Sequence, residues 1–573
     1  MIDFVISQKK GIQTTSKLSN CFELSKENTL FFDCASLSLE NESKKLVIIG
    51  DCINPPNIDE LDTIDIDKIV NDLKGNFYAF LVVDKSLYVT SSAFSLLSIY
   101  YHENRSIISS SVDLIQKNSD TKFTKNKNWI ISQLLFNYQF GNDTSYNEIH
   151  LLPAFTYLKI EGGQTSMIKY FDVASNFVEK PISWKKSLNE LSDLFIKTSE
   201  LYIPQDKSVI SFTGGFDGRT LVSIASHFNK NFETFSYGKI ENDDVHIPLE
   251  NSKELGLPYF WLDLDKMYSK EHYIESSFEY VKNTNGANGF LYAHVDYSAK
   301  KVREKSSVLI SGVCGSELFR AAHSSGAVTS QTLLNLFQFD SIEEYRNSII
   351  NSGVFKYIDK ESHSNEIEDL IQESWNYKLS LPGKLTKNQK LYVFVYEEIF
   401  RKFFGAWVIA QIKYVKVRTP FIDFDFFKAI IETELSGAYS DFLTENPIKR
   451  FKGQVFYADV IKKTNKRIYK MKTGKGYAPK IIREPILRPL LLIPFLRKRL
   501  HRKIISTNLD NLGIISGIEK YKEALMKLKD NNQFNKEKLL FDLNNLTPYT
   551  SEVERDNLLM SISLLTYNKL KDE

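Results

Sequence analysis

Hydrophobic residues follow two different patterns along the chain. Up to about residue 172 they form short β-branched and aromatic runs that end at turn residues, as in segments 44–56, 75–92 and 155–172. Such runs are typical of β-strands, and the Gly-Gly pair at 162–163 predicts a hairpin turn. From about residue 185, short strand-like runs alternate with helical ones. This alternation predicts a parallel sheet with helices on both faces.

The second pattern is clearest around a strand predicted at 208–212 and a helix predicted at 218–228. Apolar residues of that helix recur at i, i+3, i+4 and i+7 from Leu221, so one of its faces can pack on the sheet. Residues 232–238 and 306–312 predict two further short strands.

Two later segments, 365–435 and 515–573, are predicted to be mainly helical. We therefore expect a mainly β domain over residues 1–175 and an α/β domain over 176–573 whose C-terminal part is helical. A chain of 573 residues is longer than one hydrophobic core usually serves, which also favours two or more domains.

Composition excludes several classes of function. The formal net charge is +2, from 73 basic and 71 acidic residues, so it does not favour a nucleic-acid partner. No run of about 20 apolar residues predicts a membrane-spanning helix, and the first residues lack the apolar core of a signal peptide. The four cysteines form no CxxC pair, which argues against a zinc site and a disulfide framework. We expect a cytoplasmic protein.

One loop carries candidate chemistry. Residues 211–220 read SFTGGFDGRT, at the carboxyl end of a predicted strand and the start of a predicted helix. The glycines let the backbone approach a phosphate, and a helix N-terminus favours an anion. The loop lacks the GK[ST] lysine and has Asp217 instead, which would repel phosphate unless a cation intervenes. We expect Asp217 to bind Mg²⁺ and Arg219 to donate to phosphate oxygens. The alternative is an ordinary tight turn with an exposed aspartate.

This loop resembles the SGGxDS pyrophosphatase-type loop of the asparagine synthase family. Three further segments resemble that family's motifs in the same order, over about 210 residues. Segment 233–238 resembles the strand whose backbone receives adenine, 308–320 resembles SGxGxDELF, and 415–423 resembles ExRxPFLD. Segments 75–101 and 144–160 resemble, more weakly, strands of the family's N-terminal glutaminase domain.

The resemblance implies a fold and an activity. It implies a mainly β, N-terminal-nucleophile (Ntn) glutaminase-like domain, followed by an α/β ATP-pyrophosphatase-type (adenine nucleotide α-hydrolase-like) synthetase domain with a parallel sheet. The implied activity is that of an AMP-forming carbon–nitrogen ligase, which adenylates a substrate carboxylate with ATP and Mg²⁺ and releases pyrophosphate. An amine then attacks the acyl-adenylate. The implied partners are a small-molecule or peptide carboxylate with an amine donor, and a biosynthetic partner protein is possible.

The resemblance also assigns residues. The nucleotide-contacting residues are Phe212, Thr213, Gly214, Gly215, Phe216, Asp217, Gly218, Arg219, Ser236, Tyr237 and Gly312, the last near ribose and phosphate. The metal ligands are Asp217 and Glu317, and the catalytic residues are Glu317 and a lysine in the Gly-punctuated basic segment 469–480. Lys475 is the first choice for that lysine and Lys472 the second. The alternative for the segment is a solvated basic loop.

The sequence departs from the family at three positions. Residue 2 is Ile where glutamine-using members have the catalytic Cys, so we expect no glutamine hydrolysis and an amine or ammonia as nitrogen donor. Ser316 replaces a metal-binding Asp. Three outcomes are open: Glu317 takes over as the metal ligand, Mg²⁺ is held mainly by Asp217 and the phosphates, or catalysis is lost. Lys416 replaces a Glu, and this reversed charge either alters substrate choice or simply faces solvent.

The alternative function is that of a degenerate homologue that binds nucleotide or a partner enzyme without catalysis. Arg418 and Asp423, retained from the fourth motif, are expected to pin the helical part to the sheet. Segment 486–503 is apolar and then basic, and it either lies on an anionic membrane, docks a partner or packs at a domain edge.

Overall fold

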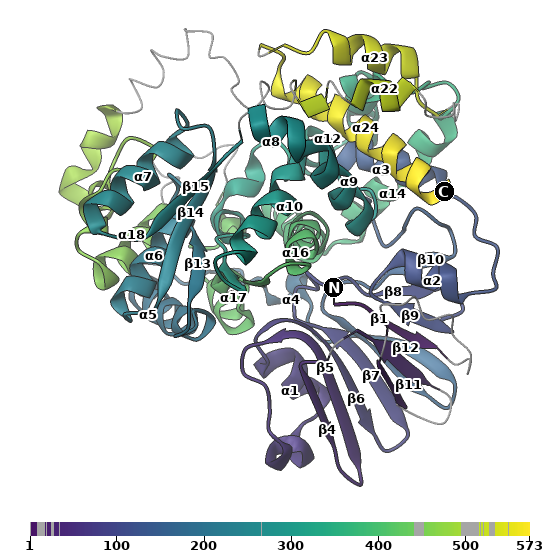
Figure 1. The fold of residues 1–573 in the computed structure, drawn as a ribbon, viewed down its shortest axis with the longest axis horizontal. Coiled ribbons are helices and arrows are strands. Elements are labelled where there is room, and N and C mark those ends of the chain that lie inside the picture. The colour runs from purple at the N-terminus through teal and green to yellow at the C-terminus, as the bar shows by residue number, and fades with distance from the viewer. Residues whose placement is uncertain are drawn as a thin grey trace.

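The computed structural model describes most of the chain. The described residues are 2–7, 18, 20–23, 28–33, 35–264, 266–440, 452–493, 515, 517–518, 521–526, 533–547 and 549–572. Within them the fold is mixed α/β, with antiparallel sheets in the N-terminal part and a parallel sheet after it (Figure 1).

Two antiparallel sheets form the N-terminal part. In spatial order the first has β10 (Ile149–Leu151), β8 (Tyr100–His102), β9 (Ile107–Ser109), β1 (Phe4–Ser7), β3 (Thr29–Phe32) and β2 (Asn20–Glu23). The second has β12 (Gln164–Lys169), β11 (Thr156–Glu161), β7 (Ser86–Ser91), β6 (Gly75–Val83), β5 (Lys44–Cys52) and β4 (Leu37–Glu40). The helices here are η1 (Ile58–Thr63), α1 (Ile66–Asp72), α2 (Val112–Asn118), α3 (Lys127–Phe136) and α4 (Val173–Asn176).

The predicted hairpin is confirmed. Strands β11 and β12 pair antiparallel, from Thr156 opposite Lys169 to Glu161 opposite Gln164. Gly162 and Gly163 join them with φ of +56° and +76°, a left-handed conformation that glycine adopts without steric cost.

The parallel sheet has the order β15 (Tyr259–Asp263), β14 (Phe232–Gly238), β13 (Ser208–Ser211), β16 (Val308–Ile310) and β17 (Lys416–Arg418). Helices α6 (Asp217–His227), α7 (Asp243–Leu255) and α18 (Lys452–Thr464) lie on one side of it, and α8 (Lys266–Glu271) and α10 (Gly289–Arg303) on the other (Figure 1). The strands predicted at 208–212, 232–238 and 306–312 are confirmed. The mainly helical prediction for 365–435 missed β17, because a three-residue edge strand is too short to show a period.

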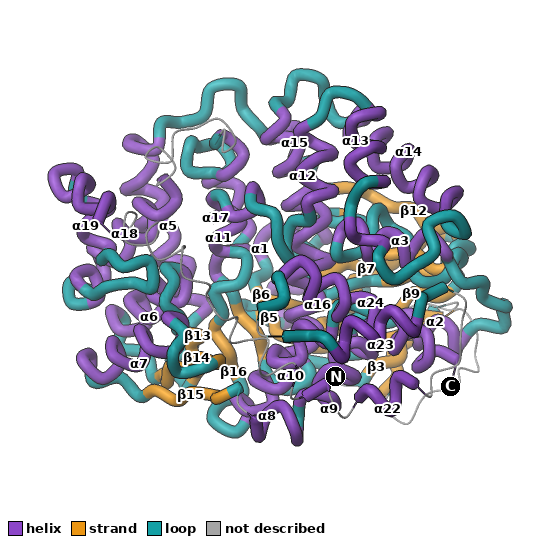
Figure 2. The backbone as a smooth tube through the Cα atoms, turned by 90° about the horizontal axis from the view of Figure 1, so that it is seen from above, coloured by secondary structure: helices purple, strands orange, loops and turns teal. Residues whose placement is uncertain are grey.

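The remaining helices surround this sheet and reach back to the N-terminal part (Figure 2). They are α5 (Trp184–Tyr202), α9 (Tyr273–Asn283), α11 (Gly315–Phe319), η2 (Ala321–His323), α12 (Gln331–Gln338), α13 (Ile342–Ile350), η3 (Gly353–Phe355), α14 (Ser364–Ser380), α15 (Lys387–Phe394), η4 (Val395–Phe404), α16 (Gly405–Ile412), η5 (Pro420–Ile422), α17 (Phe424–Ile430), η6 (Gly437–Tyr439), η8 (Ile468–Lys470), α19 (Pro479–Arg483), η9 (Pro485–Leu491), α22 (Tyr521–Met526), α23 (Lys536–Asn544) and α24 (Glu552–Asp572).

A buried ion pair joins the two parts of the chain. The Arg418 guanidinium donates to both carboxylate oxygens of Asp51 at 2.7 and 3.0 Å. Asp423 lies 3.2 Å from Lys74 Nζ and also caps α17. The expectation that Arg418 and Asp423 pin the helical part to the sheet therefore has to be corrected, because their charged partners lie in the N-terminal part. The sequence could not show this, since Asp51 is more than 360 positions away.

Candidate active site

The loop between β13 and α6 is held by close backbone contacts. A Cβ at Gly218 would lie 2.2 Å from the backbone oxygen of Ser211, and one at Gly214 would lie 2.8 Å from that of Asp243. Only glycine fits at these two positions. The Gly214 N–H donates to Asp244 Oδ1 at 3.1 Å, so part of the loop's donor capacity is used by the protein itself. Helix α6 begins without a side-chain cap, which suits an anion at its N-terminus.

Asp217 is the centre of the site. Ser316 Oγ donates to its Oδ2 at 3.0 Å, and the Tyr457 hydroxyl donates to its Oδ1. A Cβ at Gly312 would lie 2.7 Å from Asp217 Cβ. Gly312 was expected near ribose and phosphate, but its evident role is to leave room for Asp217. Burial raises the pKa of Asp217, while the two hydroxyls and the charge of Lys475 act in the opposite direction.

Glu317 lies next to this carboxylate. Burial, with a further contribution from the charge of Asp217, raises the pKa of Glu317 to about 8. Two half-buried carboxylates that repel each other would be stabilised by a cation, and Mg²⁺ is commonly held by one or two carboxylates together with phosphate oxygens. Asp217 and Glu317 therefore fit Mg²⁺. Among the described residues no cluster of three or more His, Cys, Asp or Glu side chains could hold a metal, so phosphate oxygens would have to complete the coordination.

The basic segment 469–480 reaches the loop from the far end of the fold. The Gly474 N–H donates to the Gly214 carbonyl at 2.8 Å. Lys475 Nζ lies 5.9 Å from the centroid of the Phe216 ring, and its charge lowers the pKa of Asp217. Lys472 contributes its backbone oxygen to this region. The structure thus places the side chain of Lys475 beside the loop, while the contact given for Lys472 is through its backbone.

Arg219 does not lie where its expected role requires. Its side chain is fully buried, its guanidinium lies 5.7 Å from the centroid of the Phe212 ring, and it donates to the Lys472 carbonyl at 3.0 Å. Arg219 therefore connects the basic segment to the loop through a hydrogen bond. Because its guanidinium is buried, it does not point to where a phosphate would bind. Phe212 and Phe216 are buried too, so only their backbones could face a nucleotide.

The two residues expected near adenine differ in exposure. Ser236 is buried and its hydroxyl lies 2.5 Å from that of Tyr259, so its side chain is already engaged. Tyr237 is half-buried, and its ring centroid lies 4.8 Å from that of His294. Any contact of Ser236 with a nucleotide would use its backbone, as the resemblance implies. Thr213 Oγ1 accepts the Gly215 N–H at 3.2 Å and so stabilises the loop.

Three residues of the site were not found from the sequence. They are Tyr457, Arg320 and Gln454. With its amide oxygen turned toward the cations, Gln454 accepts from Lys475 Nζ at 2.8 Å and from the Arg320 guanidinium. Arg320 ends the segment 308–320, and a cation three positions after Glu317 was a usable signal. Tyr457 and Gln454 lie on α18, where no motif marks them.

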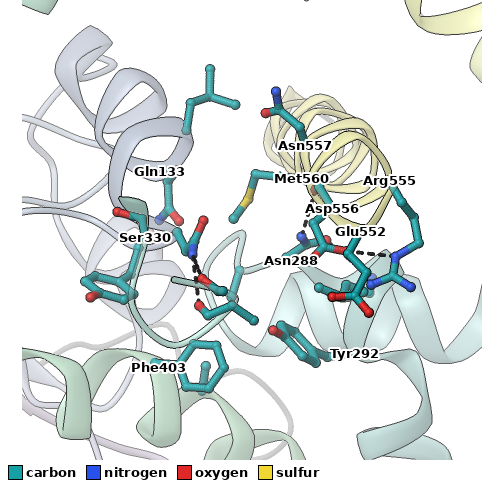
Figure 3. A pocket seen from close by; sticks show the side chains of 18 of the residues that line it. Gln133, Asn288, Tyr292, Ser330, Phe403, Glu552, Arg555, Asp556, Asn557 and Met560 are labelled. Atoms are coloured by element: carbon teal, nitrogen blue, oxygen red, sulfur yellow. Dashed lines mark hydrogen bonds and ion pairs between the residues drawn. The ribbon is translucent and has the colours of Figure 1, made fainter. Parts of the chain in front are cut away.

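A large cavity begins next to the loop. Its volume is about 1050 Å³, and its lining includes Tyr237 and Asp244, the residue that accepts the Gly214 N–H. From there it extends past α10 and η4 to α3 and the first turns of α24 (Figure 3). This volume is at the upper end for small-molecule sites, and the cavity lies at the carboxyl ends of the parallel strands, where open α/β sheets bind ligands.

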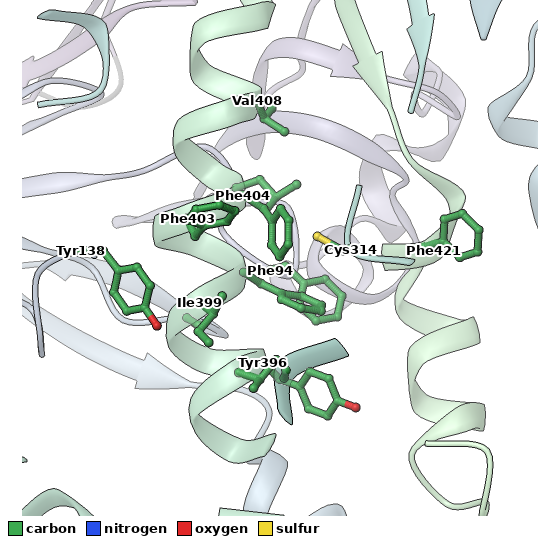
Figure 4. Packing of buried hydrophobic residues seen from close by; sticks show 14 of the residues in the cluster. Phe94, Tyr138, Cys314, Tyr396, Ile399, Phe403, Phe404, Val408 and Phe421 are labelled. Carbon is green, nitrogen blue, oxygen red and sulfur yellow. The ribbon is translucent and has the colours of Figure 1, made fainter. Parts of the chain in front are cut away.

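One wall of the cavity is a π-helix. The residues of η4, Val395–Phe404, follow the rare π-helical pattern that often marks functional sites. Phe403 lines the cavity, whereas Phe400 packs on the Phe94 ring at 5.5 Å between centroids. Figure 4 shows Phe404 of this helix and Phe94 of the N-terminal part together in the core. The same helix therefore contributes side chains both to the hydrophobic core, where it contacts the N-terminal part, and to the surface of the cavity.

Segment 486–503 is only partly within the described residues. Ile486 is 91% exposed, and Leu490, Leu492 and Ile493 are also exposed, whereas Leu491 is partly buried and packs against the core, so the apolar start of the segment packs at a domain edge only in part. Residues 494–503, which include the basic end, lie outside the described residues. In the part of the chain that the structure describes, every helix is too short or too polar to cross a membrane.

Comparison with known proteins adds no assignment to this geometry. No family model matches the chain, and no curated protein sequence matches it.

Proposed function

We propose that the chain is an ATP-dependent ligase of the asparagine synthase type, which forms an amide bond by adenylating a substrate carboxylate. The observation that carries this proposal is the pair of half-buried carboxylates, Asp217 and Glu317, which follow β13 and β16, with Lys475 close enough to Asp217 to lower its pKa. A tight turn with a solvent-exposed aspartate would need neither the second carboxylate nor the approach of a distant lysine.

In the proposed reaction, a carboxylate oxygen of the substrate attacks the α-phosphorus of ATP, and the bond from that phosphorus to pyrophosphate breaks. An amine then attacks the acyl carbon, AMP leaves and the nitrogen loses a proton. Asp217 and Glu317 would hold Mg²⁺, which would neutralise phosphate charge. Lys475 and Arg320, which share the Gln454 oxygen, would stabilise negative charge on the departing pyrophosphate.

A second function has a specific observation in its favour. Both oxygens of Asp217 already accept hydrogen bonds from hydroxyl groups, and one of these hydroxyls belongs to Ser316, at the position of the expected metal-binding carboxylate. A site completed by hydroxyls could bind a nucleotide, or support a partner enzyme, without turnover. This is the degenerate homologue.

The two functions differ in the release of AMP. The purified protein would be incubated with Mg²⁺, α-labelled ATP, hydroxylamine as a general amine and a panel of amino acids, N-acyl amino acids and peptide acids. We expect AMP and pyrophosphate with at least one acid, and a loss of about a thousandfold in Asp217→Asn and in Glu317→Gln. Asp193→Asn removes an exposed carboxylate paired with Lys463 and should leave the rate unchanged.

Binding of α,β-methylene ATP, measured calorimetrically with Mg²⁺, separates the remaining outcomes. Binding without AMP from any acid would support the degenerate homologue and overturn the ligase. Failure to bind the analogue at all would overturn the ligase and the nucleotide-binding form of the degenerate homologue.

A further inference from the structure

The cavity contains buried polar atoms that the protein leaves unsatisfied. Among the described residues, the Gln133 side-chain oxygen and the Tyr292 hydroxyl have no hydrogen-bond partner, and both residues line the cavity. Gln133 is only 3% exposed. A buried polar group without a partner costs about 1–3 kcal/mol. The carbonyl oxygen of Gln133 can only accept, so a ligand that satisfies it must offer an N–H or O–H group.

The charges around the cavity are unevenly compensated. The cations in its wall have anionic partners: Arg401 pairs with Glu398 at 2.8 Å, and Lys356 pairs with Asp542 at 2.7 Å. Lys402 also pairs with Glu398 and donates to the Gln139 carbonyl at 2.9 Å. Arg401 and Lys402 share the single carboxylate of Glu398, but their remaining donors are taken up by protein oxygens, among them the carbonyls of Leu152 and Gln139.

The acids at the start of α24 are in excess. Glu552, Glu554 and Asp556 lie within five residues of one another, and the one cation among them, Arg555, pairs with Asp556 at 2.7 Å. Glu552 is exposed and has no ion-pair partner among the described residues. Figure 3 shows Glu552 and Asp556 at the end of the cavity near Tyr292. This end carries a net negative charge that a bound cation would neutralise.

The body of the cavity is aromatic and apolar. Tyr268, Tyr273, Tyr280, Phe403 and Met560 contribute to its lining. These side chains provide large apolar surfaces, while the amide oxygen of Gln133 and the hydroxyl of Tyr292 can bind polar groups of the same ligand. An occupant that matches all parts is elongated, apolar along its length and positively charged at one end.

We propose that this cavity binds an amphipathic, amine-bearing substrate, with the ammonium group at Glu552 and the acyl end toward Asp244 and the loop. The assignment of the occupant as a substrate rests on the proposed ligase function. The binding site itself rests on the cavity, the unsatisfied polar atoms and the excess of acid at its end.

The test measures binding without ATP, so that it does not depend on catalysis. The probe is the tripeptide Phe-Leu-Phe amide with a free N-terminal amine, and its neutral match is the same peptide with an acetylated N-terminus. By calorimetry on the full chain, we expect the free amine to bind at least about tenfold more tightly than the acetylated peptide. Raising NaCl from about 0.05 to about 0.5 M should weaken only the charged probe.

Three variants locate the interaction. Glu552→Gln should reduce the preference for the amine to less than about threefold, because it removes the charge without changing shape. Gln133→Leu should weaken both peptides by about the same factor, three- to tenfold. Glu304→Gln, an exposed carboxylate paired with Lys301, is the matched control and should change neither affinity.

Equal binding of the two peptides, or a preference unchanged in Glu552→Gln, would overturn the proposal, as would failure of both peptides to bind. Probe binding without AMP formation in the ligase assay would instead disprove the ligase and leave the cavity assignment standing.

Discussion

The loop site and the cavity meet at Asp244, yet they are built in opposite ways. The loop site is small and charged, and backbone contacts at Gly214, Gly218 and Gly312 fix it so tightly that an added methyl group would clash. The cavity has a volume of about 1050 Å³, and its wall of mixed aromatic, apolar and polar side chains is assembled from helices that lie hundreds of residues apart. The proposed phosphate role of the loop requires one geometry, whereas the proposed ligand of the cavity requires only a complementary surface.

This difference predicts that the two regions respond separately to mutation. Changes at the loop should affect AMP release without affecting binding of the tripeptide amide, and changes in the cavity wall should do the reverse. The following predictions test that separation.

Lys475 should give the largest effect. Lys475→Ala removes the cation beside Asp217, and loss of one such charge-stabilising group costs about 10²–10³-fold in rate. Lys472→Ala should cost less than about threefold, because the backbone oxygen that holds Arg219 remains. AMP release and peptide binding would be measured on both variants. A larger loss in Lys472→Ala would reverse the assignment of the two lysines.

His294 should make the cavity wall sensitive to acid. Burial lowers the pKa of His294 to about 4, so the folded chain keeps it neutral while the unfolded chain takes up a proton below about pH 6.5. The free energy of unfolding is therefore unaffected by this group above about pH 6.5. It falls by about 3 kcal/mol in all as the pH drops toward 4, because only the unfolded chain takes up the proton readily.

His294→Gln should flatten this dependence in urea unfolding measured from pH 7 to pH 4. The matched variant His227→Gln, at an exposed position of α6, should keep the dependence of the wild type. If His294→Gln and the wild type lose stability equally, the ring is not the group responsible.

Gly312 tests whether the loop is limited by geometry. In Gly312→Ala the new Cβ would lie 2.7 Å from Asp217 Cβ, so the carboxylate must move. A displacement of about 1 Å can cost about a hundredfold in rate, and we expect that loss in AMP release with peptide binding intact. Gly383→Ala is the control, because nothing lies within 4 Å of the position of its Cβ. Wild-type rates in Gly312→Ala would show that the loop tolerates this shift.

Arg320 should give the smallest effect. Arg320→Gln keeps a polar group near Gln454 but removes one of the two cations that share its oxygen. We expect about a tenfold loss of AMP release, with Lys475 retaining most of the stabilisation, and partial recovery in Arg320→Lys. Loss as large as that of Lys475→Ala would make the two cations a single functional unit.

The sequence predicted local structure well where the signal was local. The strands around the loop, the hairpin at Gly162–Gly163 and the glycine-rich turn follow from hydrophobic periodicity and from glycine's conformational freedom. The prediction failed at β17, whose pairing depends on the neighbouring strand, and at Arg219, whose burial depends on the approach of the basic segment.

What the sequence by itself determined is the set of elements and the presence of Asp217 between a strand and a helix. What only the tertiary structure decided is which distant groups reach it: Tyr457 and Lys475 come from more than 230 positions away. It also decided that Arg418 pairs with Asp51 and that the start of α24 lines the cavity. Turns and strands are set by neighbouring residues, whereas these contacts depend on how separate hydrophobic faces pack together, and no local pattern in the chain records that.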